Sequence, residues 1–570
     1  MSITLPFFKR DRARPVAVAP ELSAGPQGIT AGFPRGVAGD GNTKPVATGW
    51  WPSSAELAAK LDTWKPGHFL IGRDETGRYY GHRDDRHILT VAGTRAGKGV
   101  SLIVPNILYF PGSCILIDPK GELATLTASR RSAQGSTWAQ PMDPGRGHVF
   151  VLDPFERVSG PAVRFRSSFN PLADLDPNTE RGIELSWQIA DALVKQSDGD
   201  GAFWTQSARS FLRGLILYIA SSEPPPSKNL IRLRELVTQD TTEFNAMLAR
   251  MHKAGGIVRR TADAMNNRPP QERMSVLSTC EVHTSFLEGP SMERVLRGSD
   301  FALEDLKTDR LTVYLCLPAT KLATHERWLR LMVALAIDAI ERTGIMPAHK
   351  PPVLFCLDEF AALGHMSSIE SAAGQIAGFG ARLWPIVQDV TQLQRDYKAA
   401  WETFMGNAGL LTFFGNTDIT TLEHVAKRLG ETEVNRPVES RGDNWSEQTG
   451  GSTPDWWSAI IGTGSGSQSS STTRAGSTNS SLQITRAALM NPDEFGRLFS
   501  RGANNVLAAI SRPDLPPFAL SRCAYFSPDD AALFGGLYDP LPEMPAPHTN
   551  AAEREERDTA RLWHVPVVDR

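Results

Sequence analysis

The chain has 570 residues, enough for roughly three or four domains of about 150 residues each. Hydrophobic residues make up 41% of it and charged residues 22%, values typical of a protein that buries a core. The net charge of -3 excludes a globally basic protein, so any contact with nucleic acid must come from a local patch. The five cysteines include no C-x-x-C pair, which argues against both a disulfide framework and a zinc site.

The first 50 residues are rich in Gly, Pro and Ala and lack periodicity, which predicts a flexible N-terminal arm. Within it, the basic run FFKRDRARP (Phe7 to Pro15) is either part of that disordered arm or a contact for anionic lipid or a protein partner. No apolar run approaches the ~20 residues needed to cross a bilayer. We therefore expect no transmembrane segment and, at most, a peripheral association with a membrane.

Short, continuous apolar runs that end in Gly, Pro or Asp recur along the chain. Strands buried on both faces of a parallel sheet have this pattern, because helices cover both sides. The runs are RHILTVAG from Arg86, SCILIDPKG from Ser113, HVFVLDPF from His148, RLTVYLCLP from Arg310, PVLFCLDEF from Pro352, ARLWPIVQD from Ala381, GLLTFFGN from Gly409 and NVLAAIS from Asn505. They predict an α/β fold with a mainly parallel central sheet.

Two segments with different sequence patterns lie between the apolar runs. Apolar residues at helical spacing, such as Ile183, Trp187, Ala190 and Val194, predict an inserted all-α domain. A later Gly/Ser/Thr-rich stretch cannot bury a core and predicts a flexible excursion. The expected organisation is an arm at 1–50, an α/β domain in three parts at 51–180, 300–440 and 483–545, the all-α domain at 181–299, the excursion at 441–482 and a tail at 546–570.

The stretch ILTVAGTRAGKGV, from Ile88 to Val100, predicts a phosphate-binding loop between a strand and a helix. Successive backbone N–H groups and the helix N-terminus would face an anion there, with Lys98 adding charge. The residues expected to bind nucleotide are Gly93, Thr94, Arg95, Ala96, Gly97, Lys98, Gly99 and Val100. Ala92 replaces the first glycine of the usual pattern, which is tolerable if its φ is negative. Gly99 replaces a hydroxyl ligand of Mg²⁺, but Mg²⁺ readily keeps several waters instead.

The run VLFCLDEF supplies the second half of an ATPase site. The apolar residues VLFCL lead to Asp358 and Glu359 at the carboxyl end of a strand, where ligands bind in open α/β sheets. Asp358 is expected to hold Mg²⁺, and Glu359 to orient or deprotonate the attacking water. Two solvated acids at a strand end would give the same pattern by themselves. The loop and the acid pair in this order make a joint coincidence improbable.

The motifs AGTRAGKGVSLIVPNIL, DPKGEL, VLDPF, FWTQSARSFLRGLILYIA, LDEFAALGHM, RLWPIVQD and GNAGLLTFFGNTD, in this order, resemble the TraG/VirD family of coupling-protein ATPases of conjugation and type IV secretion. The resemblance runs from about residue 53 to 538. It implies a RecA-like P-loop NTPase with an inserted all-α domain, using ATP and Mg²⁺ and assembling as a ring of six. Such a ring hands relaxase-bound DNA or effector proteins to a type IV secretion channel at the inner face of the cytoplasmic membrane of a bacterium.

The resemblance also assigns residues. It makes Lys98 the phosphate-binding lysine, Asp358 the acid on the magnesium side and Glu359 the catalytic base, and it places Gln388 where a polar residue senses the γ-phosphate. Gln388 could equally cap a strand end. The position of a trans-acting arginine in many relatives is Ala377 here, and Arg382 is either its substitute or a strand-edge arginine in solvent.

The family's two membrane-spanning helices have no counterpart in this sequence, so we expect recruitment by a partner or a separate subunit. Two other functions share the motor motifs: a cytosolic double-stranded DNA translocase of the FtsK/HerA kind, and a nucleotide-gated adaptor that hydrolyses little ATP. The substitutions at 92, 99 and 377 favour the adaptor, whereas the DPKGE and FWTQSAR segments favour the coupling motor.

Overall fold

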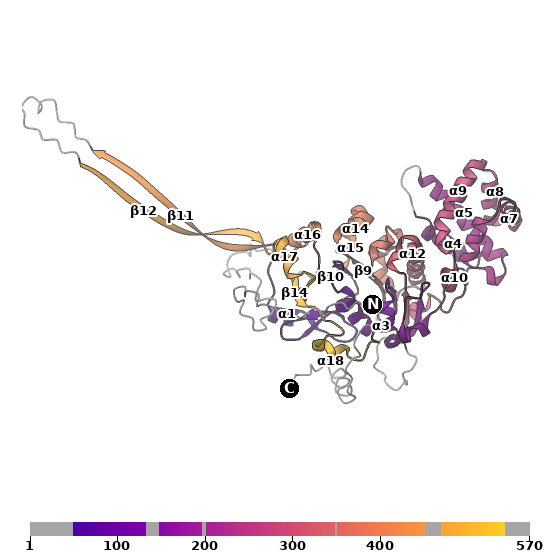
Figure 1. Ribbon diagram of the computed structural model, residues 1–570, viewed down its shortest axis with the longest axis horizontal. Coiled ribbons are helices and arrows are strands. Elements are labelled where there is room, and N and C mark those ends of the chain that lie inside the picture. Colours follow the sequence, from indigo (N-terminus) through magenta and orange to yellow (C-terminus); the bar gives the residue numbers. More distant parts are fainter. Residues whose placement is uncertain are drawn as a thin grey trace, which may run out of the picture.

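The computed structural model of the chain describes residues 49–132, 147–195, 201–347, 350–450, 469–512 and 514–541 (Figure 1). The expected N-terminal arm, apart from residues 49 and 50, and the expected C-terminal tail lie outside these residues. In the described parts of the chain, no helix is both long and apolar enough to cross a membrane.

The centre of the molecule is a twelve-stranded sheet with the order β1-β3-β2-β14-β13-β10-β4-β9-β8-β5-β7-β6. The seven strands from β10 to β6 are parallel to one another, and the other five form an antiparallel extension that begins with β13 beside β10. The parallel strands are β4 (His87–Ala92), β5 (Cys114–Ile117), β6 (His148–Leu152), β7 (Leu311–Leu315), β8 (Val353–Leu357), β9 (Ala381–Val387) and β10 (Ala408–Phe414). The others are β1 (Asp62–Thr63), β2 (Phe69–Arg73), β3 (Tyr79–His82), β13 (Asn505–Ile510) and β14 (Phe518–Ser521). The predicted α/β fold with a mainly parallel sheet is confirmed.

Helices cover both faces of the parallel strands, and the strands alternate their side chains between two cores. In β5, Cys114 and Leu116 pack in the core that contains α2 (Val104–Tyr109) and α3 (Glu122–Arg131). Ile115 packs in the opposite core, which contains α12 (Ala319–Arg342). This period of two explains why the strands are apolar throughout.

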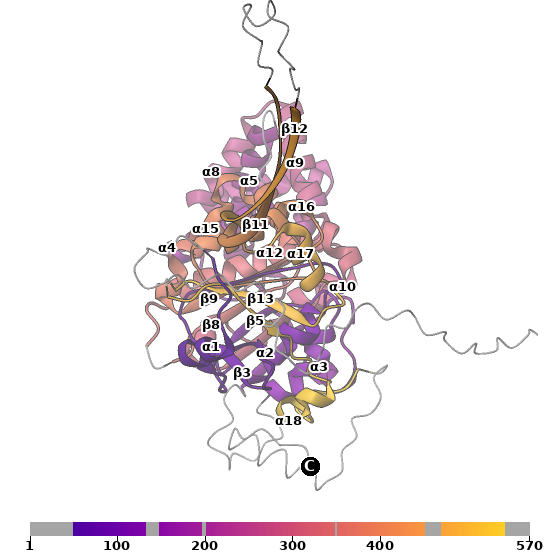
Figure 2. The ribbon, with the colours of Figure 1, turned by 90° about the vertical axis from the view of Figure 1, so that its left-hand side faces the viewer.

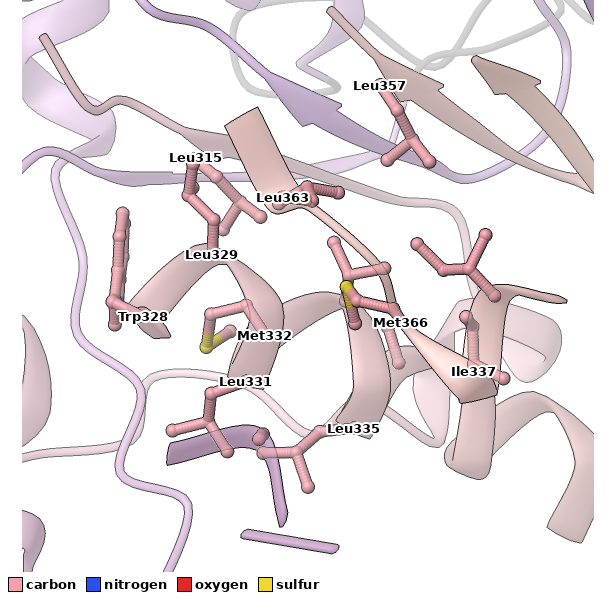
Figure 3. Packing of buried hydrophobic residues seen from close by; sticks show 14 of the residues in the cluster. Leu315, Trp328, Leu329, Leu331, Met332, Leu335, Ile337, Leu357, Leu363 and Met366 are labelled. Carbon is pink, nitrogen blue, oxygen red and sulfur yellow. The ribbon is translucent and has the colours of Figure 1, made fainter. Parts of the chain in front are cut away.

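The long helix α12 provides much of the second core. Figure 3 shows Trp328, Leu329, Met332 and Leu335 of this helix, together with Leu315 and Leu357 from the ends of β7 and β8 and Leu363 and Met366 from the segment that follows β8. The helix follows an apolar spacing of three and four residues, as an amphipathic helix against a sheet requires. This packing holds the carboxyl end of β8, which carries the acid pair.

Between residues 180 and 296, all described regular elements are helical. They are α4 (Glu180–Leu193), α5 (Gly201–Ser222), α6 (Leu230–Thr238), α7 (Thr241–Ala254), α8 (Gly256–Asn266), α9 (Pro270–Thr284) and α10 (Pro290–Leu296), with two short 3-10 turns. In Figure 1, α5 and α7 to α9 gather at one end of the molecule, beyond the sheet.

The structure differs from the expected flexible excursion at 441–482. The chain forms a two-stranded antiparallel ribbon from β11 (Glu431–Gly450) and β12 (Ser469–Ala488). The ribbon projects far from the sheet in Figure 1 and extends toward the viewer, in front of the body, in Figure 2. A low content of apolar residues prevents a segment from forming a core, but it does not prevent backbone pairing between two adjacent strands. The residues between the strands, 451–468, lie outside the described residues.

Candidate nucleotide site

The phosphate loop connects β4 to a helix. It runs from Gly93 to Lys98 and is followed by a π-helical turn at Gly99–Ile103 and by α2. Along the loop, Gly93 and Ala96 are buried, Thr94 and Arg95 are exposed, and Gly97, Lys98, Gly99 and Val100 are half-buried. The loop therefore exposes Thr94 and Arg95 to solvent, while Gly93 and Ala96 are packed against the body and the Lys98 side chain is only 15% exposed.

The structure explains the alanine at position 92. Ala92 is buried as the last residue of β4 and has no positive φ. The close contact falls one residue later, because a Cβ on Gly93 would lie 1.9 Å from the carbonyl oxygen of Gly415. Gly97 has a φ of +88° and Arg95 a φ of +55°, so the left-handed positions of the turn lie inside the loop. The glycine that the turn needs for packing is thus Gly93, and the methyl group of Ala92 fits.

A Cβ built on Gly99 would have no atom within 4 Å. The serine or threonine usual at this position would therefore fit, and no other group of the described residues takes the place of its hydroxyl. Ser101, two residues on, donates its hydroxyl to the carbonyl of Gly97 at 2.9 Å and does not face the acids. The loop therefore supplies no hydroxyl from the position that usually binds Mg²⁺.

The acid pair lies directly against the loop lysine. The Lys98 Nζ is 2.9 Å from Asp358 Oδ1 and 3.0 Å from Glu359 Oε1. Glu359 has a left-handed backbone, φ +54°, which turns its side chain toward the lysine immediately after β8. Burial acts to lower the pKa of Lys98, but the two carboxylates outweigh it and raise that pKa. Lys98 therefore stays charged.

Gln388 follows β9 and joins the two halves of the site. Its Nε2 donates to Glu359 Oε2 at 3.0 Å, and its Oε1 accepts a hydrogen bond from the Thr94 hydroxyl at 2.8 Å. The structure thus brings Thr94, Lys98, Asp358, Glu359 and Gln388 into one network, at the carboxyl ends of β4, β8 and β9. A capping role for Gln388 alone does not account for its bond to Glu359.

Two buried residues that the sequence analysis did not select also support the loop. Arg522 follows β14 and donates hydrogen bonds to the carbonyls of Ala96 and Ala503, while its guanidinium lies 4.9 Å from the ring centroid of Phe414. Asn416 follows β10, and its Nδ2 donates to the carbonyl of Gln388 at 3.0 Å. Nothing in the local sequence marks either residue, because both act through contacts across the sheet.

The DPKGE segment adopts a tight strand-to-helix turn. Asp118 is buried and accepts from the backbone N–H of Ala124 at 2.9 Å, and Gly121 has a φ of +72°. Burial raises the pKa of Asp118 to about 6. Lys120 and Glu122 are exposed and pair with each other at 3.7 Å rather than with the Lys98 network.

Ala377 and Arg382, the two positions considered for a trans-acting arginine, lie outside the Lys98 network. Ala377 and Arg382 line a cavity formed where the parallel strands begin, at the edge of the sheet opposite the phosphate loop. Arg382 is only 7% exposed, so the interpretation as a strand-edge arginine in solvent is wrong.

A mainly parallel sheet with a phosphate loop against an Asp-Glu pair defines a P-loop NTPase of the RecA-like class. The chain belongs to the family described as "Type IV secretory system Conjugative DNA transfer", which matches residues 47–535.

Curated relatives in this family include Protein VirD4 of Agrobacterium fabrum, 27% identical over 366 residues, which cover 62% of this chain and 51% of the relative. Conjugal transfer protein TraG of Escherichia coli is 26% identical over 417 residues, which cover 69% of this chain and 60% of the relative. The chain thus spans about half the length of its VirD4 relatives.

Solved structures share the fold. The bacterial conjugative coupling protein TrwBdeltaN70 in its unbound form superposes with a TM-score of 0.58 at 16% identity, covering 86% of this chain and 94% of that one. TrwB in complex with ADP and Mg²⁺ gives a TM-score of 0.56 at 16% identity, covering 86% and 95% of the two chains.

Proposed function

We propose that the chain is an ATP-driven coupling motor that recruits relaxase-bound DNA, protein substrates or both and pumps them into a type IV secretion channel. The observation that carries the proposal is the contact of Lys98 with Asp358 and Glu359, closed by Gln388. Membership of the conjugative transfer family and the fold of the coupling protein TrwB support it.

The chain's own residues would act as follows. Lys98 and the backbone N–H groups of the loop bind the phosphate oxygens, so the ammonium leaves the carboxylates when a triphosphate enters. Glu359 accepts a proton from the attacking water, which Gln388 helps to hold. Arg522 holds the loop in place by donating a hydrogen bond to the carbonyl of Ala96.

The site fits Mg²⁺. The described residues contain no cluster of three His, Cys, Asp or Glu side chains, but Mg²⁺ is usually bound through one or two carboxylates and keeps several waters. Asp358, whose Oδ1 lies 2.9 Å from the Lys98 Nζ, is the carboxylate that would hold it. When bound, the ion neutralises charge on the phosphate oxygens. The complex of TrwB with ADP and Mg²⁺ supports this pairing of ligands.

Partners follow from the same comparison. We propose a ring of six copies that acts with the components of a type IV secretion channel at the inner face of the bacterial cytoplasmic membrane. The relatives named as conjugal transfer and coupling proteins support this placement.

A mating assay tests the motor. Donor cells that lack their own copy receive the full chain, Lys98→Ala, Glu359→Gln or, as a control, Arg395→Ala, whose side chain is 63% exposed and away from the network. We expect both site variants to lower transfer at least a thousandfold and the control to transfer normally. Normal transfer by either site variant would refute the motor.

One competing function has an observation in its favour. A nucleotide-gated adaptor would need binding without turnover, and the chain has neither a hydroxyl at 99 nor an arginine at 377. Tight ATP binding with no turnover, with DNA present and at high protein concentration, would favour the adaptor.

A further inference from the structure

A cavity of 830 Å³ lies at the amino-terminal ends of several parallel strands, whereas the phosphate loop follows the carboxyl end of β4. Its walls come from the segments before β2, β4, β5, β7 and β8, from the 3-10 turn Ile376–Phe379 and from the start of β9. The volume lies within the ~300–1,000 Å³ typical of sites for small molecules. The Lys98 network does not line it.

Arg382 at the wall of this cavity lacks a partner. It is 7% exposed, its Nε is buried, and its side chain makes no hydrogen bond or ion pair with the described residues. The carboxylates of Asp84 and Asp85 are near enough to attract the guanidinium but do not hydrogen-bond to it. Asp84 instead accepts hydrogen bonds from Arg86, from its Nε at 2.8 Å and from its backbone N–H at 3.0 Å. Burial lowers the pKa of Arg382 to about 10. A buried guanidinium without a hydrogen-bonded counter-ion is strongly unfavourable, so a ligand that supplies one gains affinity.

The lining of the cavity contains a second buried polar atom without a hydrogen-bond partner among the described residues. The Nδ1 of His68, which also lines the cavity, is buried without a hydrogen-bond partner. The exposed side chains of Arg83, Arg310 and Lys350 add cationic charge, so four cationic side chains in the lining outnumber two carboxylates.

We propose that this cavity binds a phosphate group through the guanidinium of Arg382. A guanidinium offers two parallel N–H donors that match phosphate oxygens, and His68 Nδ1 adds a polar partner. The phosphate belongs either to a small free phosphate compound or to the nucleotide bound by a second copy of the chain. Only the second source rests on the proposed function.

Direct binding tests the site without the phosphate loop. The full chain carrying Lys98→Ala is titrated with inorganic tripolyphosphate at fixed ionic strength. We expect saturable binding that weakens at least tenfold when Arg382→Gln is added and stays the same when Arg395→Gln is added. Absent saturable binding in the Lys98→Ala chain, or equal binding with Gln at 382, overturns the proposal.

The folded state supplies an independent test. Arg382→Met removes the unpaired charge and keeps the length of the side chain, so its melting temperature should equal or exceed that of the wild type. A clear fall would show that Arg382 has a structural partner in the folded chain, and it would overturn the proposal.

A mixing experiment separates the two sources. If the phosphate belongs to a second copy, Arg382→Gln and Lys98→Ala chains each turn over little ATP, and their mixture regains turnover. If it is a free compound, Arg382→Gln alone keeps normal turnover. If the wild type turns over ATP but its Lys98→Ala variant shows no saturable tripolyphosphate binding, this inference alone is refuted, whereas a wild type without turnover would refute the motor.

Discussion

At the residue scale, a single guanidinium connects the last strand of the sheet to the phosphate loop. Arg522 donates to Ala96 within the loop and, at 2.6 Å, to Ala503 in the segment before β13. Since buried carbonyls that lose their donors are costly, Arg522 fixes the loop as well as the C-terminal strands.

Replacing Arg522 should therefore loosen the loop. We expect Arg522→Met to weaken ATP binding at least tenfold and to lower the free energy of unfolding by about 1–3 kcal/mol, because the carbonyls of Ala96, Arg501 and Ala503 lose a donor. Calorimetric titration with ATP and denaturant unfolding measure the two effects. Arg512→Met is the matched control, since Arg512 is 44% exposed and pairs with Asp514. ATP affinity equal to the wild type in Arg522→Met would remove its positioning role.

Asp118 gives a pH dependence. Because burial raises its folded-state pKa to about 6, the neutral form is favoured in the folded state, and stability falls as the pH rises through that value. Asp118→Asn removes this loss. We expect the stability of Asp118→Asn relative to the wild type to increase by about 1–2 kcal/mol from pH 5 to pH 8, at ~1.4 kcal/mol per pKa unit. Urea unfolding at both pH values measures it, and a difference that does not change with pH would contradict the buried-acid account.

At the element scale, the β11–β12 ribbon is separable from the sheet. At the base of the ribbon, the backbone N–H of Gly49 in the body donates to the carbonyl of Glu431, and just outside the two strands the N–H of Leu489 donates to the carbonyl of Gly430. Its two strands otherwise pair with each other over their full length.

Shortening the ribbon tests this independence. Residues 435–484 are replaced by Asn-Gly, a pair that favours a two-residue hairpin turn between Val434 and Thr485, which are paired in the register. We expect the melting temperature to change by no more than a few degrees and ATP turnover by no more than twofold. Failure of this variant to fold would show that the ribbon supports the body.

The elements also differ in how far the sequence determines them. The strands of the parallel sheet are predictable because each is apolar throughout and ends in a turn residue. The order in which they lie, and the antiparallel extension from β13 to β1, depend on contacts between distant segments. The ribbon was missed because its pairing is between backbone groups, which a polar sequence does not reveal.

The candidate site divides in the same way. Lys98, Asp358 and Glu359 are predictable because each follows a buried strand in a known pattern, and parallel strands bring their carboxyl ends together. Arg522 and Asn416 are not, since their function depends on long-range hydrogen bonds. The interpretation of Arg382 failed because its burial comes from loops that precede other strands.

At the scale of the whole molecule, the carboxyl ends and the amino ends of the parallel strands hold different functional groups. The carboxyl edge holds the Lys98 network, and the amino edge holds the cavity around Arg382. A ring that places one edge of each copy near the opposite edge of the next would bring the two together, which the mixing experiment above detects.

The central claim is that Lys98, Asp358 and Glu359 form a nucleotide-hydrolysing centre. The most direct measurement is ATP binding and ATP turnover on the same purified chains, in Mg²⁺ and with DNA. The account predicts that Glu359→Gln binds ATP as tightly as the wild type but turns it over at least a hundredfold more slowly, and that Lys98→Ala loses binding. Wild-type turnover in Glu359→Gln, or undiminished binding in Lys98→Ala, would contradict it.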